Sequence, residues 1–251
     1  MQMNYLITSL QENEKFKEVV ENVNEKISPI AISGLSDVSK VSIISSILES
    51  TKRKICVLTY NEIQAKKLVK DLKYFFKQVY FLPKREIAPY DYIAESKDLP
   101  YERIAVLNKI ILQEKSKEPI IIVTTIEAAM QKMISKEELY ENIVDFKIGE
   151  TYSIENLKQT FVKLGYERTN LIEGQGQFSI RGGIVDVGLS NKIGVRIEFW
   201  GDEVDSIRYF KIDSQRSTEM IQNITIFPAH EVIVQNIYNA IKKIEENYSN
   251  V

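Results

Sequence analysis

One stretch constrains the fold more than any other: residues 176–216, with the sequence GQFSIRGGIVDVGLSNKIGVRIEFWGDEVDSIRYFKIDSQR. β-Branched and aromatic residues fill four short runs, and Gly, Asn and Asp separate these runs where tight turns are expected. The pattern predicts four strands, at residues 177–180, 183–187, 195–200 and 203–210. Because apolar and charged residues alternate along them, we expect an antiparallel sheet with one apolar face and one charged face.

The first part of the chain shows a different pattern, in which short apolar runs alternate with segments of helical spacing. The apolar runs predict strands at residues 29–33, 55–59, 79–82 and 119–124. Helices are expected before and between them, at residues 10–26, 41–48, 63–75 and 103–114, with an irregular loop at 83–100. Strands that alternate with helices form parallel sheets, so residues 1–125 are predicted to be an α/β domain.

A second domain is predicted after residue 125, where short helices at 126–133 and 136–140 and a strand at 143–148 precede a helix at 153–164. Together with the β-rich stretch they indicate an inserted α+β domain over residues 126–231 that bears the antiparallel sheet. Beyond it, apolar residues recur at steps of three and four: Val234, Ile237, Ile241, Ile244 and Tyr248. This spacing predicts an amphipathic helix, which we expect to belong to a further part of a longer protein.

Composition excludes several classes of protein. The net charge of −2 gives no overall attraction for nucleic acid, so a charged partner must be bound by a local cluster. The single histidine, His230, and the single cysteine, Cys56, cannot form a zinc site or a disulfide, and Cys56 is expected to be a buried core thiol. No apolar run reaches the roughly 18 residues of a membrane span, so a soluble cytoplasmic protein without membrane contact is expected.

The stretch GLSDVSK, residues 34–40, has the spacing of a degenerate phosphate-binding loop, whose intact form reads G-x-x-x-x-G-K-[ST]. The positions that decide its chemistry are Gly34, Asp37, Ser39, Lys40 and Val41. Ser39 replaces the second glycine, and Val41 replaces the hydroxyl that would hold Mg²⁺. A carboxylate at Asp37, about 4 Å from a phosphate charge, costs about 4 kcal/mol at an effective dielectric constant of about 20. The loop is therefore not expected to bind or hydrolyse ATP; in the alternative interpretation, Ser36 or Asp37 caps the following helix.

Several motifs resemble one family. The runs GQFSIRGGIVDV, VRIEFWGDEVDSIRYF, DSQRS and IFPAHE resemble the second domain of the transcription-repair coupling factor (Mfd) family, and a related pattern occurs in the excision-repair protein UvrB. Further upstream, LPKREIAPYDYIAESKDLPYERIAVLNKI and IIIVTTIEAAMQKM resemble the first domain of the same family. The resemblance implies a degenerate P-loop-like domain 1a at residues 1–125, a UvrA-binding domain 2 at 126–231 and the start of domain 1b at 232–251.

The resemblance also implies a function. It indicates a module that recruits UvrA to RNA polymerase stalled at DNA lesions, has no catalytic residue and binds neither cofactor nor metal. ATP and Mg²⁺ would belong to the translocase module of the longer parent, which would displace the polymerase; RNA polymerase and DNA would be contacted through that parent and its other domains.

The alternative is a nucleotide-dependent domain that handles damaged DNA, as in UvrB. UvrB, however, has an intact phosphate loop and a long aromatic hairpin where this chain has only residues 88–100. Three tyrosines remain there, and they are expected to be packing residues: Tyr90, Tyr92 and Tyr101.

The partner contacts are expected among the arginines of the second domain. The resemblance implies that Arg168 and Arg181 contact UvrA, and strand alternation adds weaker candidates: Phe178, Arg196, Phe199 and Arg208. Arginine suits the carboxylates of a partner because its guanidinium group donates two parallel hydrogen bonds. In the alternative interpretation these arginines only pair with carboxylates of their own sheet, at Glu167, Glu173, Glu198 or Asp205. Turn positions are expected at Asp213, Gln215 and Arg216.

Overall fold

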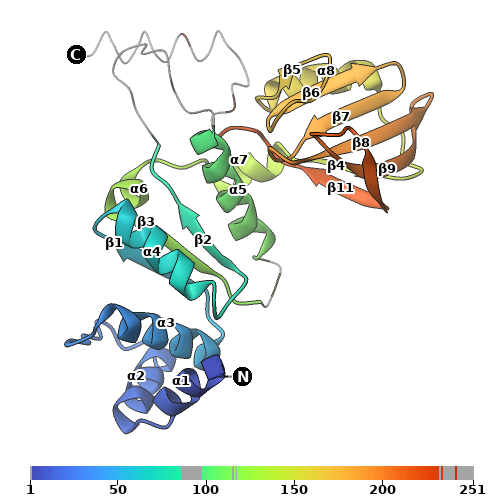
Figure 1. Ribbon diagram of the computed structural model, residues 1–251. Coiled ribbons are helices and arrows are strands. Elements are labelled where there is room, and N and C mark those ends of the chain that lie inside the picture. The colour runs from blue at the N-terminus through green and yellow to red at the C-terminus, as the bar shows by residue number, and fades with distance from the viewer. Residues whose placement is uncertain are drawn as a thin grey trace. The chain divides into compact units, whose positions relative to one another are not determined.

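The computed structural model describes residues 2–85, 98–114, 116, 118–231, 233 and 241 (Figure 1). The chain divides into two compact units. Unit 1 holds the described residues up to Ala94 together with Ala105–Gln131, and unit 2 holds those of Glu95–Ile104 and of Lys132–Val251. Helix α5 (Asp98–Leu112) therefore contributes its first residues to unit 2 and the rest to unit 1.

Unit 1 is an α/β unit built on a small parallel sheet. Its other elements are α1 (Gln2–Gln11), α2 (Glu14–Asn24), α3 (Asp37–Thr51), β1 (Ile55–Thr59), α4 (Glu62–Leu72), β2 (Val79–Leu82), β3 (Ile121–Thr125) and α6 (Ile126–Met130). The three strands lie in the order β1-β3-β2, and Ile121 of β3 pairs with both Ile55 and Val79. Side chains of α4, β2 and β3 form the core between sheet and helix, which confirms the predicted parallel α/β arrangement.

Several predictions for unit 1 were wrong in detail. Residues 29–33 form no strand, and Ile32 is 41% exposed. The helix expected at 10–26 is two helices, because the Asn13 side chain accepts a hydrogen bond from the Phe16 N–H (3.3 Å) and caps α2. Cys56 is exposed rather than buried. In the described part of the sheet β1 is an edge strand whose side chains alternate between half-buried and exposed along most of its length, so a continuous apolar run does not mean burial here.

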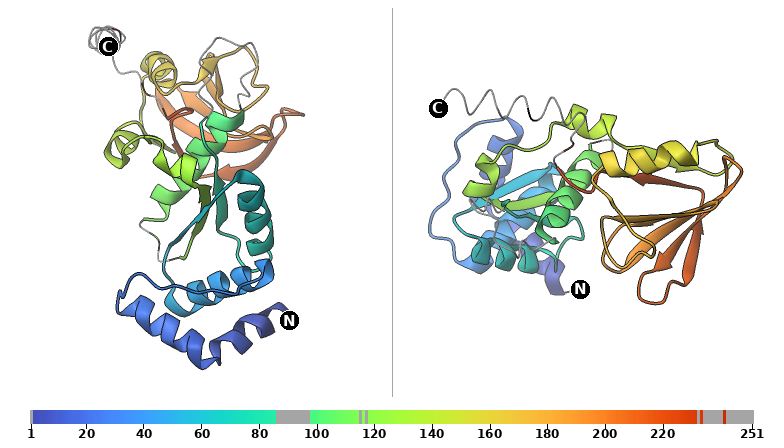
Figure 2. Two further views of the ribbon diagram at one scale, coloured as in Figure 1. Left: turned by 90° about the vertical axis from the view of Figure 1, so that its left-hand side faces the viewer. Right: turned by 90° about the horizontal axis from the view of Figure 1, so that it is seen from above.

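Unit 2 is an α+β unit dominated by a six-stranded sheet (Figures 1 and 2). Its elements are α7 (Lys136–Glu141), β4 (Val144–Lys147), α8 (Ile154–Lys163), β5 (Glu167–Arg168), β6 (Gln177–Arg181), β7 (Ile184–Gly188), β8 (Ile193–Trp200), β9 (Glu203–Lys211), β10 (Ser217–Ile221) and β11 (Asn223–Ile226). The strand order is β10-β9-β8-β7-β6-β5, with only β5 and β6 parallel, and β4 pairs separately with β11. The four strands predicted from the turn pattern, β6 to β9, are confirmed within two residues.

The apolar face of this sheet packs against α8. Phe161 of α8 is fully buried, and its ring lies 5.2 Å from that of Phe178 on β6. Val185, Val195 and Ile197 from the next two strands complete this core and are also fully buried. Figure 2 shows α8 lying across one face of the sheet. The opposite face therefore carries the polar residues of the same strands.

The first residues of α5 pack within unit 2. The Tyr101 ring stacks on His230 with 5.2 Å between the ring centroids, and Arg103 forms a buried ion pair with Glu231. This confirms that Tyr101 is a packing residue, whereas Tyr90, Tyr92 and most of the predicted helix at 232–251 lie outside the described residues. Among the described helices, none has the length and apolar character needed to cross a membrane.

Candidate protein interface

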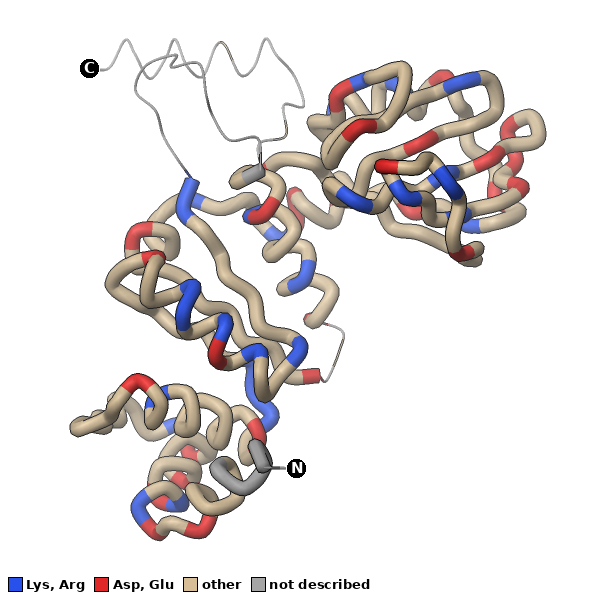
Figure 3. Tube along the Cα trace, in the orientation of Figure 1, with Lys and Arg blue, Asp and Glu red and all other residues tan. Residues whose placement is uncertain are grey.

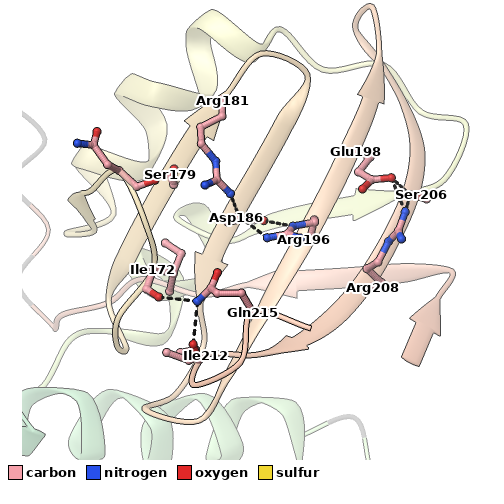
Figure 4. A network of polar contacts seen from close by, with 11 residues as sticks. Ile172, Ser179, Arg181, Asp186, Arg196, Glu198, Ser206, Arg208, Ile212 and Gln215 are labelled. Carbon is pink, nitrogen blue, oxygen red and sulfur yellow. Dashed lines mark hydrogen bonds and ion pairs between the residues drawn. The ribbon is translucent and has the colours of Figure 1, made fainter. Parts of the chain in front are cut away.

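The candidate site is the face of the six-stranded sheet opposite α8, which we call the polar face. Strand alternation and cross-strand register bring five charged side chains onto it: Arg181, Asp186, Arg196, Glu198 and Arg208. Figure 4 shows them on neighbouring strands, and Figure 3 shows basic and acidic positions interspersed in this part of the chain. Glu203, in register with Trp200 at the hairpin end of the same face, adds a third carboxylate, so the three arginines are balanced by three acidic side chains.

Asp186 is the centre of the first network on the polar face. Its side chain is 1% exposed and accepts two hydrogen bonds from Arg196, Nε to Oδ1 at 2.7 Å and Nη2 to Oδ2 at 2.9 Å. Arg181 donates a third, from Nη2 to Oδ2 at 2.8 Å. These bonds to Asp186 raise the pKa of Arg196. The guanidinium of Arg196 also lies 5.1 Å from the centroid of the Phe210 ring, which makes it a fixed part of the sheet.

Arg181 differs from Arg196 in its exposure. Its side chain is 47% exposed, against 18% for Arg196, although both pair with the same carboxylate. Arg181 uses one of its N–H groups for Asp186, and an arginine has about five such donors. The remaining N–H donors of Arg181 are therefore available to a partner, while the hydrogen bond to Asp186 fixes the position of its guanidinium group.

A second network connects strands β8 and β9. The Ser206 hydroxyl donates to Oε2 of Glu198 (2.9 Å), Arg208 forms an ion pair with the same carboxylate, and Nη2 of Arg208 lies 3.0 Å from the Ser206 oxygen. Arg208 and Glu198 are 30% and 31% exposed. Arg208 thus pairs with a carboxylate that the sequence predicted as an alternative, although Asp186, which binds the other two arginines, was not predicted.

A short apolar cluster supports one end of the polar face. It consists of Ile172, Phe210 and Ile212. Gln215, in the left-handed conformation (φ 54°), donates from Nε2 to the carbonyl oxygens of Ile172 (3.0 Å) and Ile212 (2.8 Å). These bonds confirm the structural turn role predicted for Gln215, since they connect the loop before β6 with the turn after β9.

Two aromatic candidates are wrong as partner contacts. Phe178 is fully buried and Phe199 is 9% exposed, and both belong to the apolar core. The physical reason is strand parity, because residues with a step of two share a face. Phe178 lies one position from Ser179, which faces Asp186 across the strands, and Phe199 lies one position from Glu198.

Arg168 is exposed but does not share the polar face. It lies on the edge strand β5, where it is in register with Phe178. Because paired residues of neighbouring strands point to the same face, Arg168 is directed to the face that carries α8. The structure therefore brings together Arg181, Arg196 and Arg208, and separates them from Arg168.

One exposed residue on the polar face was missed. Trp200 ends β8, is 85% exposed and is the only tryptophan of the sequence. Two features of the sequence could have identified the two residues that were not predicted, Trp200 and Asp186. Trp200 directly precedes the predicted turn Gly201-Asp202, where a large aromatic residue is seldom buried, and Asp186 lies between two valines in an apolar strand, where a carboxylate needs a partner.

The degenerate phosphate loop is the start of a capped helix. Ser36 caps α3 by accepting a hydrogen bond from the Ser39 N–H (3.2 Å), as the alternative interpretation predicted. Asp37 binds Lys40 (3.3 Å) and Lys67 (2.8 Å), and the hydrogen bond from Lys67 is the main cause of the lowered pKa of Asp37.

A cavity of about 320 Å³ lies beside these charges, lined in part by Val57, Leu58 and Leu68. Gly34 (φ 76°) precedes the helix, and Val41 is buried in it. No strand leads into the loop within residues 29–33, so a complete P-loop topology is not confirmed. The described residues contain no group of His, Cys, Asp and Glu that could hold a metal ion.

The antiparallel sheet with its arginine-bearing polar face lies in the part of the chain that matches a known interaction domain. Residues 144–232 match the family described as the UvrB interaction domain. Over 237 residues, 93% of the chain, it is 31% identical to the transcription-repair-coupling factor of Bacillus subtilis (strain 168). It is 28% identical over 235 residues to the factors of Staphylococcus aureus strains bovine RF122 / ET3-1 and Mu50 / ATCC 700699, with 92% of the chain covered.

These matches confirm the resemblance found in the sequence: the chain is a relative of the transcription-repair-coupling factors. The chain spans 20% of the length of each of these relatives. The match to the UvrB interaction domain begins at the first residue of β4 and ends just after the last described strand, so it covers the polar face completely.

Proposed function

We propose that unit 2 is a protein-interaction module that binds the repair protein UvrA through the polar face, with Arg181 as the central contact. The observation that carries this proposal is the environment of Arg181, which is 47% exposed and anchored by the buried carboxylate of Asp186. A pre-positioned guanidinium loses little side-chain entropy on binding and donates two parallel hydrogen bonds to a carboxylate. The exposed guanidinium of Arg181 favours a carboxylate of the partner at this position.

Arg196 and Arg208 have a supporting role in this proposal. Both are bound to carboxylates of their own sheet and are less exposed than Arg181. They hold Asp186 and Glu198 in place and reduce the negative charge that a partner carboxylate would meet. The module is expected to work in the cytoplasm, as part of a longer protein.

In that longer protein, the module would recruit UvrA to RNA polymerase stalled at DNA lesions. RNA polymerase and DNA would be bound by other domains of the parent, whose translocase module would use ATP and Mg²⁺ to displace the polymerase. The similarity to transcription-repair-coupling factors over 93% of the chain supports this role.

Titration of UvrA with the purified chain tests the contact. Arg181→Ala is expected to weaken binding at least about ten-fold, because truncation of a central arginine leaves the partner carboxylate unpaired. Arg53→Ala is the matched control, since Arg53 is an exposed arginine of unit 1, and it should leave the affinity unchanged. Equal affinity of Arg181→Ala and the unsubstituted chain would exclude Arg181 as the contact.

The second candidate function is nucleotide-dependent handling of damaged DNA. The cavity beside Lys40 favours it, since its volume of about 320 Å³ falls within the usual range of ligand sites. Asp37 opposes it, because its carboxylate already occupies the ammonium groups of Lys40 and Lys67. We therefore propose that this chain is not an ATPase and binds no cofactor. Calorimetry with Mg-ATP is the test, and micromolar affinity would contradict this proposal.

A further inference from the structure

Trp200 is an exposed tryptophan that the fold does not use. Its 85% exposure is the highest among the large hydrophobic side chains of the described residues. A tryptophan offers about 150–250 Å² of surface for burial, so full exposure leaves a strong potential contact unsatisfied. In protein interfaces, tryptophan and arginine are the residues most enriched among those that dominate the binding energy.

Backbone hydrogen bonds on both sides of Trp200 fix the hairpin that carries it. The N–H of Phe199 donates to the carbonyl of Gly183 (2.7 Å), and the N–H of Tyr152 donates to the carbonyl of Asp202 (2.8 Å). Trp200 is in register with Glu203 across a tight turn in which Gly201 adopts a positive φ of 63°. The indole is therefore presented by an ordered hairpin rather than by a long loop.

Strand alternation places Trp200 on the polar face. Arg196, Glu198 and Trp200 follow one another at steps of two along β8, whereas Ile197 and Phe199 between them point into the core. Arg181 is in register with Ile184, which is in register with Glu198. Two strand spacings and two residues along β8 separate the Cα atom of Arg181 from that of Trp200, which corresponds to about 12 Å along the sheet.

We propose that Trp200 is a second anchor of the polar face, which inserts into an apolar pocket of the protein whose carboxylate binds Arg181. The proposal rests on the function proposed above and adds a specificity element to it. The partner would present a carboxylate and an apolar pocket close enough together to lie within one interface of standard size.

The single tryptophan allows a direct test. The chain is produced with 5-fluorotryptophan, so that one ¹⁹F resonance reports Trp200 while unlabelled UvrA contributes none. On addition of UvrA, the resonance is expected to shift or broaden and to lose its dependence on the D₂O content of the solvent. Trp200→Ala is expected to weaken binding at least about ten-fold, and Trp200→Phe less than that.

Controls separate this inference from the proposed function. Tyr60→Ala removes another exposed aromatic residue, in unit 1, and should bind as the unsubstituted chain does. If Arg181→Ala weakens binding while Trp200→Ala does not and the resonance stays unchanged, the second anchor is overturned and the function stands. If UvrA does not bind the chain at all, both are overturned. A resonance that shifts with the concentration of the chain alone would assign Trp200 to self-association and overturn the proposal.

Discussion

Arg103 and Glu231, which lie 128 positions apart in the sequence, form an ion pair in which both side chains are buried, with 0% and 5% exposure. A second contact joins Nη2 of Arg103 to Oε2 of Glu231 at 3.4 Å. The pair connects the first turns of α5 with the segment that follows β11. Arg103 thus belongs to unit 2, although Ala105–Gln131 of unit 1 separates it in the sequence from the main segment of that unit, which begins at Lys132.

Removal of one partner of this pair should destabilise unit 2. We expect Arg103→Met to lower the free energy of unfolding by about 3–5 kcal/mol, because it leaves the Glu231 carboxylate buried and unpaired. Urea unfolding followed by far-ultraviolet circular dichroism measures this change. In the matched control Lys147→Met, which breaks an exposed ion pair with Glu150, the loss should stay below about 1 kcal/mol. A similar loss in both variants would contradict the prediction.

Gly176 provides a second test of the packing around Tyr101. A Cβ atom at Gly176 would lie 2.2 Å from the Tyr101 hydroxyl oxygen, and the residue has a φ of 75°. Gly149 has a similar φ of 82° but nothing within 4 Å of its Cβ position. Gly149→Ala should therefore cost only the left-handed strain of about 1–2 kcal/mol, and Gly176→Ala about 1–3 kcal/mol more. Equal melting temperatures of the two variants would show that Tyr101 does not pack there.

His230 should make the stability of unit 2 dependent on pH. Burial lowers the pKa of His230 below the ordinary histidine value of about 6.5. The unfolded protein then binds the proton more tightly, so stability is complete above pH of about 6.5 and decreases as the pH falls below it. Urea unfolding at several pH values should show a decrease of at most about 1.4 kcal/mol per pH unit from this group. His230→Gln should lack this component, and an unchanged pH profile would contradict the assignment.

Arg168→Ala should affect partner binding less than Arg181→Ala. Arg168 is in register with Phe178 and is directed to the α8 face, away from the polar face. We expect its replacement to change the affinity for UvrA within about two-fold, whereas Arg181→Ala weakens it at least about ten-fold. Titrations of both variants decide the point. Equal losses would mean that the partner extends around the β5 edge of the sheet.

The sheet of unit 2 was predictable because its strands are local features. Glycine and aspartate mark the turn between Trp200 and Glu203, and the period of two identifies the strands on either side. It was harder to predict which face of the sheet each residue occupies, because one position separates Phe178 in the core from Ser179 on the polar face. The strand predicted at residues 29–33 was wrong for a different reason. A strand needs a neighbouring strand to pair with, and an apolar run of five residues does not identify one.

The interface residues depend on contacts between strands, which a single sequence does not contain. Arg181 was predicted from the family resemblance, and Arg196 and Arg208 from strand alternation, but the carboxylates considered as their partners did not include Asp186. Asp186 forms an ion pair with Arg196, its register partner on β8, and a diagonal ion pair with Arg181 on β6. Only the observed register shows that one carboxylate serves both.

Through this shared carboxylate, the direction of the exposed Arg181 side chain depends on the buried residue Asp186. Asp186 is 1% exposed, so a partner protein could hardly contact it. Its replacement by a neutral residue would nevertheless release Arg181 from its fixed direction and leave two adjacent cations to repel each other. A substitution at the buried Asp186 would therefore be expected to change the proposed binding of a partner, although the partner would not contact the substituted residue.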